Sequence, residues 1–369
     1  MVELADIFRR HGPAYRARFG DRMPPSHLAA MAAIEQCRTE ALGGHVYQCP
    51  DCGDLEYSYH SCKNRHCPKC QNEAATRWLE QQRALLLPVP YFLVTFTLPE
   101  ELRPVARSHQ HRMYNLLFQT SAAALQALTL DPHYLGGQIG MVGVLHTWTR
   151  DLAYHPHVHY LVPGGALSSE GSQWLSPRSA AWLVPVRALS KLFRGKFKAA
   201  LTTAGLCDPV PPQVWHKDWV THCQPAGTGT EVLAYFAPYI CRIAITNNRL
   251  ETLEDGHVTF RFKKRAGAGW KRLTLPAEAF IHRFLQHVLP RGFIKVRYYG
   301  VLSPSRRKVL PQIRTLLAAC LSNDPAPESI PRRSRQLTRP APAQERCCRT
   351  CGGPLVFLGR LSPHPREPP

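Results

Sequence analysis

The feature that most restricts the fold is a cluster of five cysteines and three histidines between residues 45 and 75. It contains two C-x-x-C turns, at 49–52 and 67–70, separated by fourteen residues. Each turn directs two thiolates to one point, and four thiolates complete a tetrahedral Zn²⁺ site. The spacing is typical of a zinc ribbon, in which two such turns lie at the ends of short hairpins. We therefore predict a structural Zn²⁺ site formed by Cys49, Cys52, Cys67 and Cys70.

Further candidate ligands lie close to these turns, and the sequence leaves their roles open. Cys37, Cys62 and His66 are all within reach, but four ligands close a structural zinc site. They serve another purpose unless a second ion binds. Near the far end of the chain, Cys348 and Cys351 form another C-x-x-C. Only half a site is visible there, so uncomplexed thiols are the default interpretation.

The charge of the chain is strongly positive, with 46 Lys and Arg against 26 Asp and Glu and a net charge of +20. Such an excess attracts polyanions, and nucleic acid is the commonest polyanion in a cell. A membrane surface is the rival partner. However, the sequence has no basic amphipathic anchor, no secretory signal and no apolar run of about 18 residues. We expect a cytoplasmic protein that binds nucleic acid and whose cysteines stay reduced.

The chain divides into four zones. Residues 1–44 are expected to be helical, and residues 45–78 to form the zinc-binding module. Residues 85–303 alternate β-rich and helical segments and form the main domain. Residues 304–369 are rich in Pro and Arg, contain the last C-x-x-C, and are expected to form a flexible basic tail.

The main domain has the pattern of an α+β fold. Strands are expected at 91–98, 139–147, 154–162, 243–246, 257–262 and 294–299. Helices are expected at 100–128, with an interruption near Pro104, and at 186–201 and 231–242. Short connections between strands favour an antiparallel sheet flanked by helices over a doubly wound parallel sheet.

Residues 154–160 read Y-H-P-H-V-H-Y and carry the most informative pattern for function. Residues two apart on a strand point to the same face, so His157 and His159 project together as a preorganised pair of metal ligands. His146 lies eleven residues before His157, on the strand expected to pair with it. We predict that His146, His157 and His159 hold a divalent ion with open positions, and that His155 is a further candidate ligand.

Two tyrosines have the spacing of a helix face. Tyr235 and Tyr239 are four residues apart, although Pro238 between them is expected to kink the helix. A tyrosine hydroxyl is a poor nucleophile because its unperturbed pKa is about 10. A divalent cation on the non-bridging oxygens of a phosphodiester offsets charge and orients the phosphorus for in-line attack. Histidines and tyrosines together therefore indicate a phosphotyrosine-forming reaction on DNA.

A basic helix face offers candidate phosphate contacts. Lys191, Arg194 and Lys198 share one side of the helix expected at 186–201, opposite its apolar residues. We assign them as candidate DNA-binding residues. A merely solvated face is the equally open alternative.

These residues resemble a known family. His157-Val158-His159 is similar to the His-hydrophobic-His motif of HUH endonucleases. The longer run H-T-W-T-R-D-L-A-Y-H-P-H-V-H-Y-L-V-P-G-G resembles rolling-circle transposases of the insertion sequence ninety-one type. So do the S-C-K-N-R-H-C-P-K-C-Q, Y-F-A-P-Y-I-C-R-I-A-I-T-N-N-R-L and F-I-H-R-F-L-Q-H-V-L-P-R-G-F-I-K-V-R-Y-Y-G segments, so the resemblance runs from about residue 5 to residue 303.

The resemblance implies an HUH-endonuclease-like catalytic domain over 85–303, preceded by a zinc-ribbon module. It implies Mg²⁺ or Mn²⁺ at the histidines, Zn²⁺ at the cysteines, and Tyr235 and Tyr239 as nucleophiles. His146 as third ligand rests on a likeness to the histidine spacing of conjugative relaxases in the same superfamily.

The implied function is transposition. Such an enzyme nicks single-stranded DNA at transposon ends, forms a 5′-phosphotyrosine intermediate and completes rolling-circle transposition. The alternatives are a relaxase or replication initiator with the same chemistry, and a non-catalytic zinc-dependent DNA-binding regulator. The zinc ribbon ahead of the catalytic motifs and the lack of a helicase-like extension favour transposition.

Overall fold

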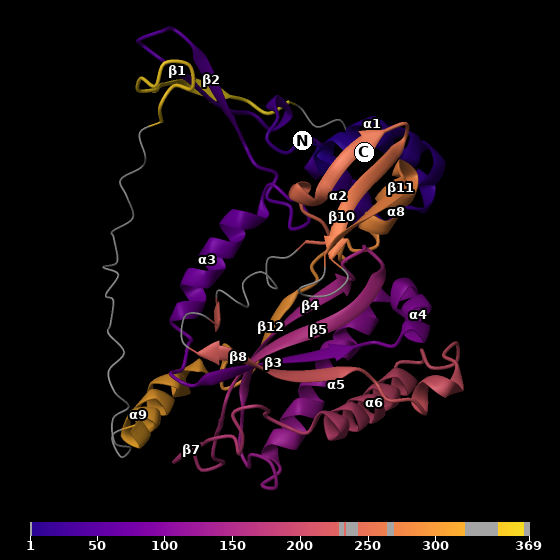
Figure 1. Ribbon diagram of the computed structural model, residues 1–369, viewed down its shortest axis with the longest axis vertical. Helices are drawn as coiled ribbons and strands as arrows, with labels where there is room; N and C mark the ends of the chain where they lie inside the picture. Colours follow the sequence, from indigo (N-terminus) through magenta and orange to yellow (C-terminus); the bar gives the residue numbers. More distant parts are fainter. Residues whose placement is uncertain (1, 229–231, 234–242, 264–268, 322–345, 365–369) are drawn as a thin grey trace.

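The computed structural model describes residues 2–228, 232–233, 243–263, 269–321 and 346–364. At its centre lies a five-stranded antiparallel sheet with the strand order β12-β4-β5-β3-β8 (Figure 1). The strands are β3 (Pro90–Thr97), β4 (Gly140–Trp148), β5 (Tyr154–Pro163), β8 (Thr221–Thr228) and β12 (Val296–Gly300). The antiparallel sheet and its helices confirm the predicted mixed α+β class.

Helices cover one face of this sheet: α4 (Arg103–Ser108), α5 (Gln110–Leu130) and α6 (Val186–Thr203). Alternate strand residues such as Phe96 and Tyr160 point into this layer, because neighbouring residues of a strand face opposite sides. Phe96 meets Phe193 of α6 edge-on, with ring centroids 5.0 Å apart. Gly143 lets the Tyr160 ring lie against β4, since a Cβ there would be 2.5 Å from a ring carbon.

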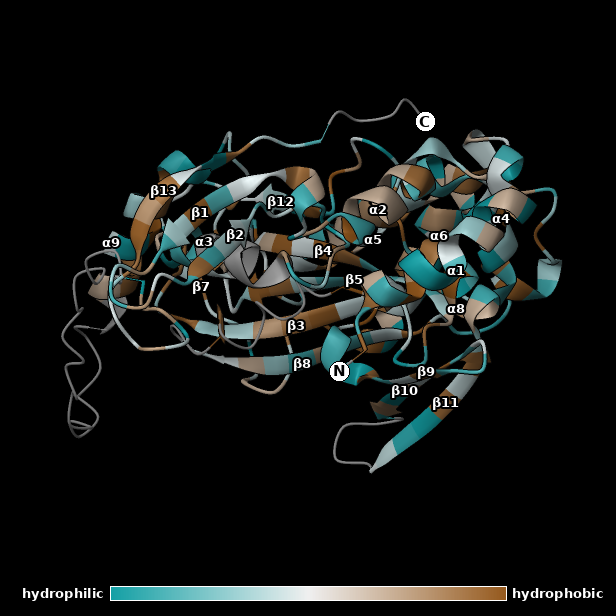
Figure 2. Cartoon of the chain, turned by 90° about the horizontal axis from the view of Figure 1, so that it is seen from above, coloured by the Kyte–Doolittle hydropathy of each residue, from teal (hydrophilic) through white to brown (hydrophobic). Residues whose placement is uncertain are grey.

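The opposite face of the sheet is partly covered by a smaller core. Leu93, Val144 and Leu161 belong to it, together with side chains from α9 (Leu310–Leu321). The short strands β6 (Ala166–Leu167) and β7 (Trp174–Leu175) close its far end. Because the inner strands β3 and β4 are packed on both faces, they carry long hydrophobic stretches, whereas β11, which is mostly exposed, is largely hydrophilic (Figure 2).

A separate hydrophobic core joins the start of the chain to residues 244–288. The helices α1 (Leu4–Phe19) and α2 (Pro25–Glu35) share this core with α8 (Ala277–Leu285) and with a sheet of order β11-β10-β9. The strands of that sheet are β9 (Leu250–Glu254), β10 (His257–Lys263) and β11 (Trp270–Pro276). The helical N-terminus therefore packs on residues that the sequence assigned to the main domain.

A third small sheet unites the two ends of the chain. β1 (Gly44–Gln48) pairs with β2 (Leu55–Tyr59) on one side and with β13 (Val356–Leu361) on the other. Helix α3 (Gln71–Arg83) leads from the cysteine-rich segment towards the central sheet (Figure 1). Part of the expected tail, 307–321 and 346–364, is thus built into the fold, which corrects the expectation of a flexible tail over these residues.

Three details of the expected secondary structure are corrected. The helix expected at 100–128 is interrupted at His109, while Pro104 lies in the first turn of α4, where a missing N–H is tolerated. Residues 243–246 form no strand. β8 was not expected because its sequence, THCQPAGT, contains Pro and Gly, which an edge strand accepts. The helix expected at 231–242 lies outside the described residues except for Val232 and Leu233, which are helical.

Among the helices in the described part of the chain, none combines the length and the apolar character needed to cross a bilayer.

Candidate metal centres and active site

Two neighbouring strands bring three histidines to one face of the central sheet. β4 and β5 pair with His146 opposite His157 and with Val144 opposite His159. Side chains directly opposite one another in an antiparallel pair project to the same side. His146, His157 and His159, here called the histidine triad, therefore share one face, which is opposite the layer of α4, α5 and α6. We call this side of the sheet the histidine face.

The triad is compact enough to hold one cation. Its ligand nitrogens lie within 4.8 Å of one another. Ring centroids are 4.9 Å apart for His157 and His159, 5.0 Å for His146 and His159, and 5.4 Å for His146 and His157. His146 is buried, whereas His157 and His159 are half-buried. Three imidazoles, two of them only half-buried, fit a divalent ion that keeps positions open for a substrate.

Hydrogen bonds orient two of the rings. His157 Nδ1 lies 2.7 Å from the carbonyl oxygen of His155, so Nδ1 carries the proton and donates it. His159 Nδ1 lies 2.9 Å from Thr95 Oγ1 on β3. A hydrogen bond at one ring nitrogen orients the imidazole, as is common for histidines that bind a metal through the other nitrogen. Thr95 is a contributor that the sequence patterns did not reveal, because it comes from a separate strand.

His155 does not belong to the triad. Its Nδ1 lies 3.2 Å from the Arg103 guanidinium at the start of α4. Burial, together with the positive charge of Arg103, lowers the pKa of His155. His155 is therefore a neutral residue held by Arg103 rather than a fourth member of the site.

Two further residues border the triad. The Trp148 indole stacks on the His146 ring with centroids 4.7 Å apart and an interplanar angle of 25°. Lys295 Nζ lies 5.5 Å from the centroid of the Trp148 ring. The site thus combines an aromatic surface and a positive charge next to the imidazoles, both of which suit a nucleic acid backbone with unpaired bases. Sequence reasoning missed Lys295, because its position depends on the pairing of β12 with β4.

The candidate nucleophiles Tyr235 and Tyr239 lie outside the described residues. The nearest described residues before them are Val232 and Leu233, both buried. Val232 belongs to the small core on the histidine face, together with Leu93 and Val144. The chain therefore reaches the histidine face three residues before Tyr235.

The candidate DNA-binding residues lie on the other side of the sheet. Lys191, Arg194 and Lys198 are on α6, whose buried side packs against the face opposite the triad. The Arg194 guanidinium donates to the backbone carbonyl oxygen of Lys217, and Lys198 Nζ lies 5.7 Å from the Trp215 ring centroid. The structure therefore does not bring these cations together with the histidines.

In the described part of the chain, eight cysteines form two clusters rather than one. The first cysteine cluster is Cys37, Cys62, Cys67 and Cys70, and the second cysteine cluster is Cys49, Cys52, Cys348 and Cys351. The predicted grouping of Cys49 and Cys52 with Cys67 and Cys70 is thus corrected, because the two turns lie in different clusters. In the fold, each C-x-x-C turn meets a pair of cysteines from elsewhere in the sequence. The spacing between the two turns could not predict these partners.

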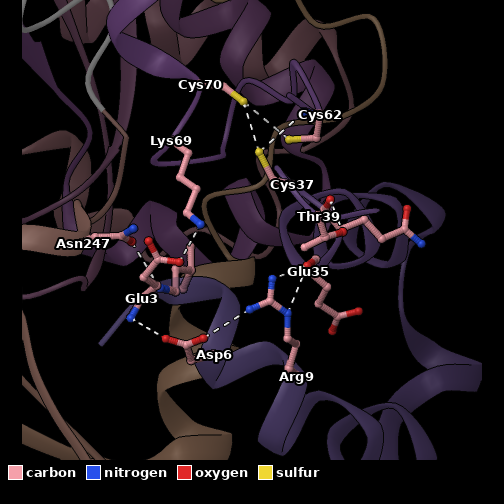
Figure 3. A network of polar contacts seen from close by, with 12 residues as sticks. Glu3, Asp6, Arg9, Glu35, Cys37, Thr39, Cys62, Lys69, Cys70 and Asn247 are labelled. Atoms are coloured by element: carbon pink, nitrogen blue, oxygen red, sulfur yellow. Dashed lines mark hydrogen bonds and ion pairs between the residues drawn. The ribbon is translucent and has the colours of Figure 1, made fainter. Parts of the chain in front are cut away.

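The first cysteine cluster lies at the edge of the N-terminal core. Cys70 Sγ is 3.6 Å from both Cys37 Sγ and Cys62 Sγ, and Figure 3 shows these three sulfurs turned towards one another. A tetrahedral site with Zn–S bonds of about 2.3 Å has sulfur–sulfur edges of about 3.8 Å. The backbone N–H of Cys62 also points at Cys37 Sγ, at 3.5 Å. Spacing and donor type both fit Zn²⁺.

Ionisation of this cluster is shared among its thiols. Hydrogen bonds from Cys62 and Cys67 lower the pKa of Cys37. The contact with Cys37 is also the largest cause that raises the pKa of Cys67. Their contact therefore favours ionisation of Cys37 over ionisation of Cys67. Four thiolates at this spacing require a cation to offset their repulsion.

Other residues of the cysteine-rich segment have structural roles. His66 Nε2 accepts the backbone N–H of Leu289 at 3.3 Å, and burial lowers the pKa of His66 to about 3. The Arg65 guanidinium donates to the carbonyl oxygens of Phe293 and Pro290, at 2.6 and 2.8 Å. His66 is therefore not a ligand of the first cysteine cluster. Instead, His66 and Arg65 connect the cysteine-rich segment to the chain after α8 through these hydrogen bonds.

Comparisons with known proteins agree with this architecture. A family model described as "Transposase zinc-binding domain" matches residues 7–98, and one described as "Putative transposase" matches residues 140–309. The "Putative transposase y4qJ" of Sinorhizobium fredii is 42% identical over 360 residues, which cover 91% of this chain and 90% of that protein. The "Transposase for insertion sequence element IS801" of Pseudomonas savastanoi pv. phaseolicola is 26% identical over 292 residues, 72% of this chain and 68% of the relative.

The first cysteine cluster lies within the residues matched by the zinc-binding model, and the histidine triad lies within those matched by the transposase model. The chain belongs to the insertion sequence ninety-one (IS91) family of two-tyrosine transposases with an N-terminal zinc-binding domain.

Proposed function

We propose that this transposase nicks single-stranded DNA at the ends of its element through a tyrosine nucleophile and a divalent ion at the histidine triad. The observation that carries the proposal is the convergence of His146, His157 and His159 on one sheet face, with ligand nitrogens within 4.8 Å. Val232, three residues before Tyr235, packs on the same face. This placement supports an approach of the tyrosines to the triad.

The proposed cleavage exchanges one phosphodiester for another. The hydroxyl oxygen of Tyr235 or Tyr239 attacks phosphorus, the bond from phosphorus to the 3′ oxygen breaks, and the phenolic proton is lost to solvent or a base. The 3′ oxygen takes up a proton and leaves as a free hydroxyl, while the 5′ phosphate stays on the tyrosine. A Mg²⁺ or Mn²⁺ ion at the triad supplies charge neutralisation on the non-bridging oxygens.

The chain's own residues prepare this reaction. The carbonyl of His155 fixes the tautomer of His157, and Thr95 engages Nδ1 of His159, so both rings are held in orientation. Trp148 offers a surface for stacking of an unpaired base, and Lys295 adds positive charge beside it. These groups orient the strand so that the scissile phosphate meets the triad.

Two tyrosines suit rolling-circle transposition. A phosphotyrosine bond conserves the energy of the broken phosphodiester, so a free 3′ hydroxyl can attack it and restore the DNA backbone. With one tyrosine holding a DNA end, the other is able to cut a second strand. We propose this division for Tyr235 and Tyr239, with single-stranded DNA at transposon ends as the partner.

We also propose that the first cysteine cluster holds a structural Zn²⁺ ion. Four protein ligands leave no open position, so this ion stabilises the fold and performs no chemistry. Its place at the edge of the N-terminal core, which includes Cys37 and Cys67, links the zinc-binding segment to α1 and α2. The cluster therefore sets the position of α3, which begins directly after Cys70.

A covalent-adduct assay tests the proposed activity. The protein is incubated with Mg²⁺ or Mn²⁺ and a labelled single-stranded oligonucleotide that carries the element's end, and the products are separated under denaturing conditions. We expect an adduct that is lost in the Tyr235→Phe, Tyr239→Phe double variant and in His157→Ala. Absence of an adduct with both cognate ends would instead support a zinc-dependent DNA-binding regulator. An adduct restricted to a plasmid transfer or replication origin would support the relaxase or initiator.

A further inference from the structure

The second cysteine cluster joins parts of the chain that are far apart in the sequence. Cys49 Sγ lies 3.4 Å from Cys351 Sγ, and Cys52 Sγ lies 3.7 Å from Cys348 Sγ, across separations of 302 and 296 positions. These distances are near the edge of about 3.8 Å expected for a tetrahedral zinc thiolate site. They are much longer than a disulfide bond, which is about 2.05 Å.

The two C-x-x-C turns of this cluster have the same backbone conformation. Gly53 donates its N–H to the Cys49 carbonyl at 2.8 Å, and Gly352 donates to the Cys348 carbonyl at 2.9 Å. The φ angles of these two glycines are +75° and +80°, a region that favours glycine. A further backbone N–H, from Thr350, points at Cys348 Sγ at 3.4 Å. Two matched turns thus face each other, each presenting a pair of sulfurs.

Gly353 lies where the two turns approach each other closely. A Cβ on Gly353 would lie 2.1 Å from Asp51 Oδ2 and 3.3 Å from Cys49 Sγ. Hydrogen bonds also join the two turns: Thr350 Oγ1 donates to Asp54 Oδ2 at 2.6 Å, and the Arg349 N–H donates to Glu56 Oε1 at 2.6 Å. The C-terminal turn is therefore complementary to the N-terminal one in shape and in hydrogen bonding.

The surrounding sheet is held by strand pairing and by ring contacts, such as those of Phe357 with His45 and Tyr47, rather than by a hydrophobic core. β13 pairs with β1 from Gly44 opposite Leu361 to Gln48 opposite Val356, and Figures 1 and 2 both show these segments side by side. Among the described residues, the buried hydrophobic clusters include none from 44–59 or 346–361. Val356, Phe357 and Leu358 are each more than half exposed. A small sheet without its own core requires a metal or another cross-link for stability.

We propose that Cys49, Cys52, Cys348 and Cys351 bind a second Zn²⁺ ion, and that this ion fastens the C-terminal segment to the N-terminal zinc-binding module. The ribbon is then a split one, with half of its ligands from each end of the chain. Cys348 and Cys351 lie outside the residues matched by the zinc-binding family model, which end at 98. The second site is independent of strand cleavage at the histidine triad.

Alkylation of the native, zinc-loaded protein tests this site without any mutation. Cys52 and Cys351 are exposed, so geometry alone does not shield their thiols from a small alkylating reagent. We expect slow alkylation of both before treatment with a chelator and fast alkylation after it. Cys347, which is exposed but outside the cluster, is the internal control, and its rate should not change. Equal rates at Cys52 and Cys351 before and after chelation would overturn the proposal.

Metal content and hydrogen exchange supply the second test. The Cys348→Ser, Cys351→Ser double variant should contain one zinc ion fewer than the wild type by native mass spectrometry, whereas Cys347→Ser should retain the full content. In the double variant, amide exchange should rise in β1 and stay unchanged in β4 and β5, which shows that the main fold is intact. Unchanged zinc content in the double variant would contradict the split site.

Discussion

Thr95 on β3 and His159 on β5 lie directly opposite each other, and Thr95 Oγ1 is 2.9 Å from His159 Nδ1. This contact holds the His159 ring against rotation. The hydroxyl would therefore act on the proposed metal site through the imidazole, so we propose Thr95 as a positioning residue.

Replacement of this hydroxyl should weaken metal binding. Thr95→Val keeps the shape of the side chain and removes the partner of His159 Nδ1, and loss of such a partner typically reduces metal affinity about 10–100-fold. The matched control is Thr97→Val on the same strand. Thr97 is opposite His157, whose Nδ1 is already held by the His155 carbonyl. Titration with Mn²⁺ measures both variants, and equal affinities in the two would show that Thr95 has no special role.

The proposed role of His146 as third metal ligand can be distinguished from the role of His155 by mutation. His146→Ala removes a member of the triad and should reduce metal-dependent cleavage roughly 100-fold or more, since a metal ion contributes several kcal/mol to the transition state. His155→Ala removes a histidine that Arg103 holds outside the triad, and should leave most of the cleavage rate. Single-turnover rates on a labelled oligonucleotide compare the two. A greater loss in His155→Ala would mean that the ligands are misassigned.

Much of the main domain could be predicted from sequence. β3, β4 and β5 have the alternation or β-branched content of strands, and the two-residue spacing of His157 and His159 correctly predicted a shared face. His146 required the further assumption that its strand pairs with the next one in a matching register. The structure has that register, with His146 opposite His157.

The parts that sequence could not predict depend on contacts between distant segments. No local pattern relates Cys49 to Cys351, because the same C-x-x-C turn serves in either cluster and only the pairing of β1 with β13 brings them together. Cys37 lacks a partner in its own turn and joins its cluster through the packing of α2. Likewise, the spacing of Lys191 and Lys198 correctly indicated an exposed helix side but not the face of the sheet that α6 covers.

Acid should destabilise the protein through a buried histidine. His287 lies between Thr147 Oγ1 and the Leu152 carbonyl oxygen, and burial lowers its pKa from 6.5 to about 4. The unfolded chain therefore binds the proton more readily than the folded one. Stability from this residue is complete above pH 6.5 and falls as the pH drops from 6.5 towards 4. The total effect is roughly 3 kcal/mol.

Denaturant unfolding at several pH values measures this effect. His287→Asn is expected to be less stable at neutral pH and to show a shallower loss of stability between pH 6.5 and 4, because the titrating group is gone. Identical slopes for the variant and the wild type would assign the acid sensitivity to other groups, such as the metal-binding cysteines.

The basic side of α6 should influence DNA affinity without changing the cleavage step. Lys191 and Lys198 are on the helix that covers the face opposite the triad, so we propose that they contact DNA away from the cleavage site. The Lys191→Ala, Lys198→Ala double variant should cleave a short oligonucleotide at the normal rate. On longer DNA it should bind less tightly and show a shallower salt dependence, by about one power of salt concentration per lost phosphate contact. Slower cleavage of the short oligonucleotide would place these lysines at the active site instead.

We expect Tyr235 or Tyr239 to become covalently joined to the 5′ end of cut DNA. Mass spectrometry of the digested adduct tests it most directly, because the method locates the nucleotide on one residue. We expect a peptide that carries a nucleotide 5′ phosphate on Tyr235 or Tyr239, formed only with a divalent ion and absent from His159→Ala. A nucleotide attached to any other residue, or cleavage of the cognate end without attachment, would contradict it.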